Sequence, residues 1–351
     1  MITQSEKIIM LGIESSCDET AAAIVSSDKE ILSDVVYSQI KEHEKFGGVV
    51  PEIAARSHLE ALPWVIEQAL EKAELKITDI NAVCATAGPG LIGGVNIGLQ
   101  TAKSIAYGQN IPLVGVNHLE GHALTTRLTH NTQFPFLMLL VSGGHTQLMI
   151  VRGIGDYEEL GATLDDACGE AFDKTAKILG VGYPGGPALE QRAKEGDPKF
   201  WNLPIPMKGK PNCDFSFSGL KTRVRHLYDQ HKPMSNQEIS HMCAGFQHSV
   251  ALSLKNRVEK AMLIFRQQFD IENPDFIVAG GVAANKHIKH TLNTSAQTHK
   301  FKLCVAPAKL CTDNAVMIAW AGIENMKVGI TDAFDIPARP RWSLKELSKG
   351  Q

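Results

Sequence analysis

The chain has 351 residues, which is long for one core and suits two domains. Its 44% hydrophobic and 21% charged residues are ordinary for a soluble globular protein, and a formal charge of −3 argues against a global attraction to nucleic acid. A nucleic-acid partner would therefore need a local basic patch. We expect no signal peptide and no membrane-spanning segment. Seven cysteines without a C-x-x-C pair indicate reduced thiols and a cytoplasmic location.

The chain opens with two predicted strands joined by a polar turn, in "KIIMLGIESSCDETAAAIVSS" (7–27). This turn carries Glu14 and Asp18. A later segment, "INAVCATAGPGLIGGVNIGLQTAKSIAYG" (80–108), predicts a strand that runs through glycines into a helix. Its "GPGLIG" (88–93) fits a dinucleotide-binding pattern, but no acidic residue follows about 20 residues later. The glycines therefore indicate close backbone approach or contact with an anion.

Two histidines stand four residues apart in "GVNHLEGHA" (115–123). On a helix, His118 and His122 share one face, so both rings can reach one ion. Zinc peptidases of the H-E-x-x-H type carry their general base directly after the first histidine, where this chain has Leu119. Glu120 would lie away from the histidine face, so the peptidase interpretation is weak. A metal pair and two ordinary histidines near a helix start remain equally open.

The segment "FPFLMLLVSGGHTQLMIVRG" (134–153) repeats the strand–turn–strand pattern of the N-terminus. This repetition indicates an internal duplication with a period near half the chain. Its "LVSGGH" (140–145) is either a plain hairpin turn or a cradle of backbone amides for a phosphate or acyl group. A helix is predicted over 164–180, where the spacing of Asp173 and Lys177 favours a solvated ion pair.

A Pro-rich, polar insertion interrupts the pattern at about 196–235, and we expect it to be rich in loops. The strand–glycine–helix pattern returns at 274–292, where Asn285 follows "AGGVAA". In "APAKLCTDNAVMIAWAGI" (306–323), Asp313 is either the N-cap of an apolar helix or a third metal ligand. Two histidines and one aspartate would leave open positions and suit iron(II) or zinc(II).

Basic residues gather in the insertion and in the C-terminal tail, which we expect to lie on the surface. They form either a face that follows phosphates, with aromatic side chains that stack on bases, or an ordinary solvated surface. The aromatic residues of the insertion are also candidates for burial. The residues concerned are Lys208, Lys210, Lys221, Arg223, Arg225, Arg339, Arg341, Lys345 and Lys349, with Phe215, Phe217 and Trp342 among them.

Taken together, these segments resemble one family, TsaD, the bacterial tRNA adenosine threonylcarbamoyltransferases. The motifs occur in the family's order along essentially the whole chain. They include "GIESSCDETAAAIV", "FGGVVPEIAARSHLE", "GPGLIGGVNIG", "VNHLEGH", "LLVSGGHTQL", "GEAFDKTAKILG", "YPGGP", "DFSFSGLKT", "AGGVAANKHI" and "CTDNAVMIAWAG". Only small departures occur, with Ala284 where serine is frequent and Ala315 where glycine is frequent.

The resemblance implies an α/β fold of two duplicated lobes, like actin, sugar kinases and heat-shock chaperones, with an active-site cleft between the lobes. We expect an N-terminal lobe at 7–133 and a C-terminal lobe at 134–305 that includes the insertion. We expect residues 306–351 to return to the N-terminal lobe.

The resemblance also assigns roles to residues. It implies one divalent metal per subunit, iron(II) or alternatively zinc(II), held by His118, His122 and Asp313. It implies substrate-binding roles for the turn Leu140, Val141, Ser142, Gly143 and Gly144, and for Asp173, Gly186 and Asn285. Glu14 and Asp18 are candidates for orienting the attacking amine or accepting its proton.

The implied reaction moves a threonylcarbamoyl group from threonylcarbamoyl-adenylate to the exocyclic amine of adenosine 37 in tRNAs that read codons beginning with adenine, and releases AMP. The implied partners are tRNA, the paralogue TsaB, the ATPase TsaE and the synthase that supplies the adenylate. ATP or ADP is a further candidate ligand. We expect the isolated chain to bind tRNA weakly, because its net charge is negative.

Two other classes of function compete with this reading. A metallopeptidase would cleave peptides and lose activity on chelation. A nucleotide switch of the actin or chaperone type would bind ATP without modifying a substrate. The complete set of His118, His122 and Asp313 favours the transferase, because the inactive paralogues of the family lack it. A sugar kinase is a third option, for which no sugar-binding feature is evident.

Overall fold

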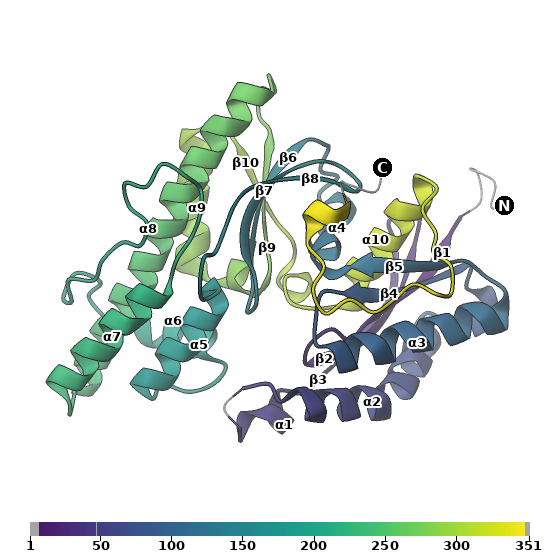
Figure 1. The fold of residues 1–351 in the computed structure, drawn as a ribbon, viewed down its shortest axis with the longest axis horizontal. Helices are drawn as coiled ribbons and strands as arrows, with labels where there is room; N and C mark the ends of the chain where they lie inside the picture. Colours follow the sequence, from purple (N-terminus) through teal and green to yellow (C-terminus); the bar gives the residue numbers. More distant parts are fainter. Residues whose placement is uncertain (1–6, 47, 348–351) are drawn as a thin grey trace. The chain divides into compact units, whose positions relative to one another are not determined.

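The computed structural model describes residues 7–46 and 48–347 (Figure 1). The chain divides into two compact units. The first comprises Met1–Asn131, Ile154–Asp156 and Asp313–Gln351, and the second comprises Thr132–Gly153 and Tyr157–Thr312. The C-terminal segment thus belongs to the first unit from Asp313 onward.

The two units repeat one sheet topology. The first sheet has the order β3-β2-β1-β4-β5 and the second has the order β10-β9-β6-β7-β8. Each strand of the first sheet has a counterpart in the second, with β1 to β5 corresponding in order to β6 to β10. The two strand orders are then the same, read from opposite edges of the sheet. The strands are β1 (Ile9–Glu14), β2 (Glu19–Ser26), β3 (Ile31–Ser38), β4 (Ala82–Gly88), β5 (Leu113–Asn117), β6 (Phe136–Val141), β7 (Thr146–Gly153), β8 (Asp156–Ala162), β9 (Asp275–Ala279) and β10 (Lys302–Val305).

Corresponding strands also pair in the same directions. β1 pairs with β2 antiparallel and with β4 parallel, and β6 pairs with β7 antiparallel and with β9 parallel. The central strands are apolar almost throughout because both of their faces are covered, as in the parallel part of α/β sheets. The internal duplication predicted from the two strand–turn–strand segments is therefore confirmed.

Helices on both faces of the first sheet enclose its core. α2 (Pro51–Lys72) and α3 (Ile92–Gln109) pack against β2, β3 and β4, and their apolar side chains join those of the strands in one buried cluster. α10 (Ala315–Lys327) packs against β1, β2 and β4 and also against α4 (His118–Thr129). Figure 1 shows α2 and α3 below this sheet, with α4 and α10 above it. The two remaining short helices of this unit are α1 (Ile40–Glu44) and α11 (Leu344–Leu347).

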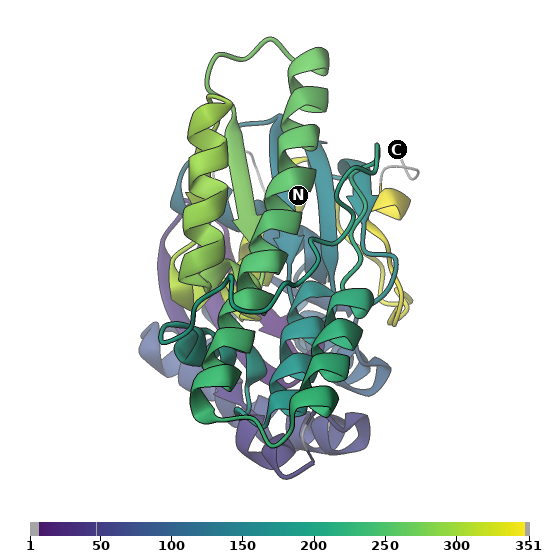
Figure 2. The same cartoon turned by 90° about the vertical axis from the view of Figure 1, so that its left-hand side faces the viewer.

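The second unit contains the longest helix, α8 (Asn236–Gln268), which runs beside α9 (Lys286–Thr298). Figure 2 shows these two helices, in green and yellow-green, side by side. Three shorter helices precede them, α5 (Cys168–Leu179), α6 (Gly185–Ala193) and α7 (Ser218–His231). α5 packs against both α6 and α7.

Two expectations about the loop-rich parts of the chain need correction. The insertion at about 196–235 is not only loop, because its last third forms α7, whose Leu220, Val224 and Leu227 are buried at helical spacing. Phe215 and Phe217 are fully buried in the same apolar cluster, so neither is available to stack on a base.

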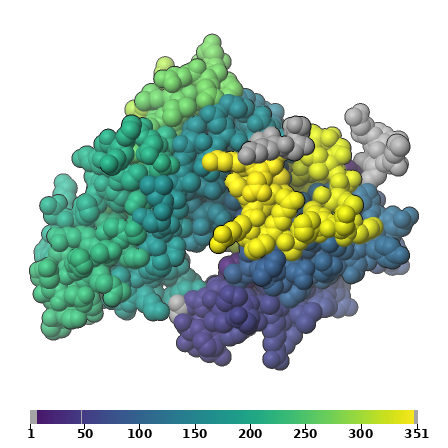
Figure 3. Space-filling view, in the orientation of Figure 1, coloured from purple at the N-terminus to yellow at the C-terminus, as the bar shows by residue number. Residues whose placement is uncertain are grey.

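The C-terminal segment is docked on the first unit. Arg339 N–H donates to the carbonyl of Ala87, and Asn117 Nδ2 donates to the carbonyl of Trp342. Trp342 is buried as well, so the alternative in which it stacks on a base is also wrong. Figure 3 shows this segment, in yellow, lying against the blue surface formed around α3. The described part of the tail therefore packs as an integral layer and not as a loose end.

No helix in the described ranges combines the length and apolar character needed to cross a bilayer.

Candidate metal centre and substrate site

The histidine pair lies at the start of α4, as the helical spacing predicts. Asn117 is the N-cap, and its side-chain oxygen accepts a hydrogen bond from Leu119 N–H at 2.9 Å. The helix therefore begins at His118, and His122 follows one turn later on the same face. Their ring centroids lie 4.9 Å apart with the planes at 88°, so the two rings meet edge to face.

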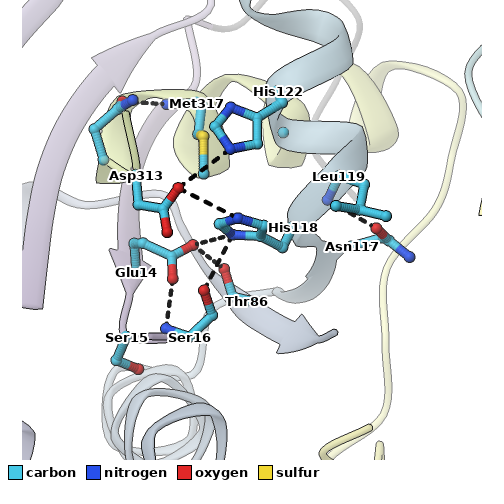
Figure 4. A network of polar contacts seen from close by, with 12 residues as sticks. Glu14, Ser15, Ser16, Thr86, Asn117, His118, Leu119, His122, Asp313 and Met317 are labelled. Atoms are coloured by element: carbon cyan, nitrogen blue, oxygen red, sulfur yellow. Dashed lines mark hydrogen bonds and ion pairs between the residues drawn. The ribbon is translucent and has the colours of Figure 1, made fainter. Parts of the chain in front are cut away.

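Asp313 reaches the same point from the other end of the sequence. Its Oδ1 lies 3.5 Å from His118 Nε2 and 3.2 Å from His122 Nε2 (Figure 4). The N-cap of α10 is Asn314, whose side-chain oxygen accepts from Met317 N–H, so the alternative in which Asp313 serves as the cap is wrong. Because its neighbour performs the capping, the carboxylate of Asp313 is available to face the two rings.

The helix that carries the histidines packs closely against the helix that Asp313 precedes. A Cβ added at Gly121 on α4 would lie 2.9 Å from Ile318 Cδ1 on α10, at the mobile end of that side chain, and 3.5 Å from the Met317 carbonyl oxygen. The donor atoms of His118, His122 and Asp313 all lie within 4.8 Å of one another. Two imidazole nitrogens and one carboxylate form a donor set that fits iron(II) or zinc(II).

Glu14 supports this set from below. Its Oε2 lies 2.9 Å from His118 Nδ1 and also accepts a hydrogen bond from Thr86 Oγ1 at 2.6 Å, and its Oε1 accepts from Ser16 N–H at 2.5 Å (Figure 4). A carboxylate on Nδ1 fixes the ring so that Nε2 faces Asp313, the arrangement found behind metal-bound histidines. Glu14 is fully buried, so this geometry favours a positioning role over contact with the attacking amine.

The charges of this cluster shift the pKa values of its members. Desolvation favours neutral His118, but the charges of Asp313 and Glu14 outweigh it and hold the pKa of His118 well above its ordinary value. Desolvation likewise opposes ionised Asp313 and Glu14, but the charge of His118 lowers the pKa of both carboxyls. Because metal-ligating imidazole is neutral, a metal would compete with a proton for His118.

Asp18 lies in the polar turn between β1 and β2, and Glu19 is the first residue of β2. Asp18 is half-buried, and its carbonyl accepts from Gln39 N–H. Burial, followed by the charges of Asp313 and Asp18, raises the pKa of Glu19 well above its ordinary value. Our sequence reasoning missed Glu19, although its position at the end of the acidic turn that follows a buried strand was the available signal. A carboxyl with a raised pKa is the kind of group that exchanges protons near neutral pH.

Glu120, the residue on which a peptidase mechanism would depend, has structural partners. Its carboxylate accepts hydrogen bonds from Gly155 N–H at 3.3 Å and Asn325 Nδ2 at 3.0 Å, and its side chain is buried. These contacts direct it away from His118 and His122. The geometry thus agrees with the sequence argument against a zinc peptidase.

The expected substrate turn lies in the second unit, where β6 ends and β7 begins. Ser142 and His145 close it, through Ser142 N–H to the His145 carbonyl at 2.8 Å and His145 N–H to Ser142 Oγ at 3.1 Å. Leu140 and Val141 are buried members of β6, whereas Gly143 and Gly144 are exposed. A Cβ built on either glycine would meet no atom within 4 Å. The tip of the turn therefore offers open backbone.

α5 begins directly behind this turn. Gly169 N–H donates to the Ser142 carbonyl at 3.1 Å, and a Cβ on Gly169 would lie 2.7 Å from the same oxygen. Further along α5, Asp173 Oδ1 accepts from Gly185 N–H at 2.8 Å, at the first residue of α6. Asp173 thus bonds the start of a neighbouring helix, and Gly186 follows at a position with open space around it.

Asn285 is the N-cap of α9 and lies after β9. Its Oδ1 accepts from Ile288 N–H at 2.9 Å, and its Nδ2 donates to Gln247 Oε1 at 2.8 Å. Contact with a substrate would therefore use the second Nδ2 hydrogen or the second lone pair of Oδ1. Because β6 and β9 are parallel neighbours, the turn and Asn285 both lie beyond the carboxyl ends of these strands, where open α/β sheets bind ligands.

Comparison with known proteins identifies the family. A family model described as TsaD, tRNA N6-adenosine threonylcarbamoyltransferase, matches residues 30–320. The chain belongs to this family. A protein of that name from Brucella anthropi is 56% identical over 344 residues, covering 97% of this chain and 96% of the relative. A TsaD-family protein of the same name from Agrobacterium fabrum is 55% identical over 342 residues, covering 95% and 94%.

Solved structures with low sequence identity show the fold. HypF from T. kodakarensis superposes with a TM-score of 0.61 at 13% identity, covering 92% of this chain and 48% of that one. Component A of the (R)-2-hydroxyglutaryl-CoA dehydratase from Acidaminococcus fermentans gives 0.53 at 17% identity, covering 91% and 98%. Both are members of the actin-like ATPase and sugar-kinase fold, which confirms the expected fold class of this TsaD-family chain.

Proposed function

We propose that this chain transfers the threonylcarbamoyl group from threonylcarbamoyl-adenylate to the exocyclic amine of adenosine 37 in tRNAs that read codons beginning with adenine, releasing AMP. The observation that carries the proposal is the convergence of His118, His122 and Asp313 in a chain whose family is named for this transfer. Expressed as chemistry, the amine attacks the carbamoyl carbon, a carbon–nitrogen bond forms, and the bond to the adenylate oxygen breaks. The amine proton must leave, and AMP carries away the electron pair.

The two histidines and Asp313 would hold one divalent cation, iron(II) or alternatively zinc(II), and make the transfer metal-dependent. When bound, such an ion supplies Lewis acidity and a template for substrate oxygens. Glu14 keeps His118 Nε2 directed at the site through the contact with Nδ1. Asp18 and Glu19 remain as candidates for accepting the proton of the amine, and the raised pKa of Glu19 supports the latter.

The turn of Ser142, Gly143 and Gly144 would receive the adenylate with backbone amides, which stabilise negative charge as it develops on the leaving group. The open space at both glycines supports this role. Asp173, Gly186 and Asn285 would contact the nucleoside. ATP or ADP is an alternative ligand for the same groups.

The expected partners are tRNA, a TsaB paralogue, a TsaE ATPase and the synthase that makes the adenylate. The formal charge of −3 supports weak binding of tRNA by the isolated chain, with partners adding basic surface. A cytoplasmic location is supported by seven free cysteines, six of which are buried and none of which is paired.

The test is the tRNA nucleoside content of cells depleted of their own enzyme. The wild-type chain and a His118→Ala/His122→Ala variant are expressed separately, and threonylcarbamoyladenosine is measured by mass spectrometry. We expect the wild-type chain alone to restore the modified nucleoside. A His226→Ala/His290→Ala variant serves as the matched control, because both histidines lie on helix surfaces of the second unit, outside the metal centre.

Each other outcome has a definite meaning. Restoration by both the wild-type chain and the His118→Ala/His122→Ala variant would keep the transferase function and remove the metal centre from it. Failure of the wild-type chain, when it is soluble and its own partner proteins are co-expressed, would overturn the proposed function. Micromolar binding of tRNA by the isolated chain at physiological salt would contradict the proposed need for partners.

A further inference from the structure

A groove with basic walls lies between α5 and α7 in the second unit. Its volume is about 360 Å³, and it is lined by side chains of both helices. The lining residues that matter here are Lys174, Lys177, Lys221, Arg225, Tyr228 and Asp229. None of these residues belongs to the metal centre or to the turn proposed to bind the adenylate, so the groove has no role in the function described so far.

Two neighbouring aspartates fix the walls of the groove. Asp165 Oδ1 accepts from the backbone N–H groups of Phe217 at 2.8 Å and Ser218 at 3.2 Å, which caps the start of α7. Asp166 forms ion pairs with Lys174 on α5 at 2.7 Å and with Lys221 on α7 at 2.6 Å. The loop that precedes α5 therefore holds both helices in place, and the groove is preorganised.

The next basic residue of the groove lining along each helix is differently placed. Lys177 follows Lys174 by three positions and Arg225 follows Lys221 by four, so each lies about one turn further along the same face. Both are exposed, and within the described residues neither forms an ion pair with a carboxylate. Asp229, the acidic group of the lining, forms its ion pair with Lys232 at 2.9 Å. Lys177 and Arg225 thus face the groove without a direct ion pair, although Arg225 lies near enough to Asp229 for the two charges to interact.

We propose, on the basis of the transferase function above, that this groove binds backbone phosphates of the substrate tRNA. A nucleic-acid strand presents a negative charge about every 3.4 Å along its axis, so it can engage cations on both walls together. The phenol ring of Tyr228, half-buried at the edge, adds a surface on which a base or ribose can pack. Phosphate contacts of this kind set the register of the RNA without reading its sequence.

The position of the groove fits this role. Gly169 at the start of α5 touches the Ser142–Gly144 turn, and Lys174 and Lys177 lie five and eight residues further along the helix. At about 1.5 Å per residue, they stand about 8 Å and 12 Å from that contact. A strand held there would have its neighbouring nucleotides within reach of the turn that receives the adenylate.

The experiment is a Lys177→Ala/Arg225→Ala variant of the full chain in the reconstituted transferase with its partner proteins. Both side chains are exposed, so the fold should be unaffected, and the melting temperature checks this. Loss of two phosphate contacts with a single strand reduces the magnitude of the slope of log K against log salt by about 1.4. The variant should therefore raise the KM for tRNA about sevenfold more at 50 mM salt than at 200 mM salt. The KM for the adenylate should be unchanged.

The matched control is Arg223→Ala/Lys194→Ala, which removes the same charge. Arg223 is an exposed residue of α7 outside the groove lining, and Lys194 is exposed after α6. This control should leave the salt slope near the wild-type value. An equal effect in both variants would reduce the result to general electrostatics and overturn the assignment to the groove.

Further outcomes separate the groove from the proposed function. If the wild-type complex forms no threonylcarbamoyladenosine, the proposed function fails. If it is active but the groove variant keeps the wild-type KM and salt slope for tRNA, the groove assignment fails alone. A rise in the KM for the adenylate would assign the groove to the small substrate, and a loss of partner binding with unchanged tRNA affinity would assign it to a protein. Either result would overturn the proposal.

Discussion

The metal centre of the first unit and the substrate turn of the second are organised in opposite ways. The metal centre consists of side chains that are buried or, for Asp313, half-buried; His118 and Asp313 contact each other, and Glu14 contacts the far nitrogen of His118. The turn consists of exposed backbone, with Gly143 and Gly144 surrounded by open space. The first arrangement should be sensitive to any change in side-chain chemistry, whereas the second should be sensitive mainly to added bulk.

The largest effect is expected at Asp313, the ligand contributed by the distant C-terminal segment. Asp313→Asn keeps the shape of the side chain and removes the charge that faces both histidines. We expect loss of bound metal and a fall in transfer rate of more than about 100-fold, because even outer-shell changes cost 10–100-fold. Metal content by plasma mass spectrometry and single-turnover transfer would measure both quantities.

Asp335→Asn is the matched control for this change, because Asp335 is an exposed residue of the same segment. The control should retain metal and activity. If Asp313→Asn kept full metal occupancy and a normal transfer rate, Asp313 would not belong to the functional ligand set. The contrast between the metal centre and the turn would then be wrong.

The next effect concerns Glu14, which contacts a ligand and not the metal itself. Glu14→Gln retains the volume but weakens the acceptor opposite His118 Nδ1. We expect metal affinity to fall 10–100-fold and transfer to recover when metal is added in excess. Competition with a chelating dye measures the affinity, and Glu52→Gln on the exposed start of α2 is the control. A slow transfer that excess metal cannot restore would instead identify Glu14 as a group that handles the proton.

A smaller effect is expected at the turn. Gly144→Ala adds one methyl group where no protein atom lies within 4 Å and where the backbone is not left-handed, so stability should be unchanged. If the adenylate occupies that space, its KM should rise about tenfold, equivalent to about 1.4 kcal/mol. Gly153→Ala, at another open glycine of the same hairpin, should leave the KM unaltered. Equal KM values for all three proteins would show that the turn does not approach the substrate.

The sequence alone predicted some features of these two regions and left others undecided. The spacing of His118 and His122 predicts a shared helix face, and the strand–turn–strand repeat predicts two related sheets, because both depend on local periodicity. The neighbouring sequence could not decide whether Asp313 is a helix cap or a metal ligand. An aspartate before an apolar helix is a good cap, and only the packing of α4 on α10 shows that Asn314 caps and Asp313 faces the rings.

In the basic insertion, tertiary contacts produce a structure that the amino-acid composition alone does not predict. Its proline and polar residues predict loops, yet residues 218–231 form α7, because Asp165 from a distant loop caps the helix start. Lys221 and Arg225 look alike in the sequence, but Lys221 is paired with Asp166 and Arg225 has no carboxylate within ion-pair distance among the described residues. Such differences depend on contacts between segments that no local pattern records.

The smallest effect lies outside both sites, at the ion pairs of Asp166. Its side chain is only 12% exposed and contacts Lys174 and Lys221. Desolvation opposes ionisation, but the hydrogen bonds from Lys174 and Lys221 lower the pKa of this carboxyl in the folded protein. Because Lys174 is substantially exposed, Asp166→Asn should lower the free energy of unfolding by no more than about 1 kcal/mol.

The stabilisation by Asp166 should depend on pH in a definite direction. A carboxyl with a depressed folded pKa stabilises the protein above its unfolded pKa of about 4, and the contribution is lost as the pH falls through the folded pKa. Urea unfolding of the wild-type chain and Asp166→Asn should therefore differ at pH 7 and converge below pH 4. Asp229→Asn, whose pair with Lys232 is exposed on both sides, should differ less at either pH. If the difference in free energy of unfolding between the two proteins grew on acidification, protonated Asp166 would stabilise the fold. That result would contradict the ion-pair geometry.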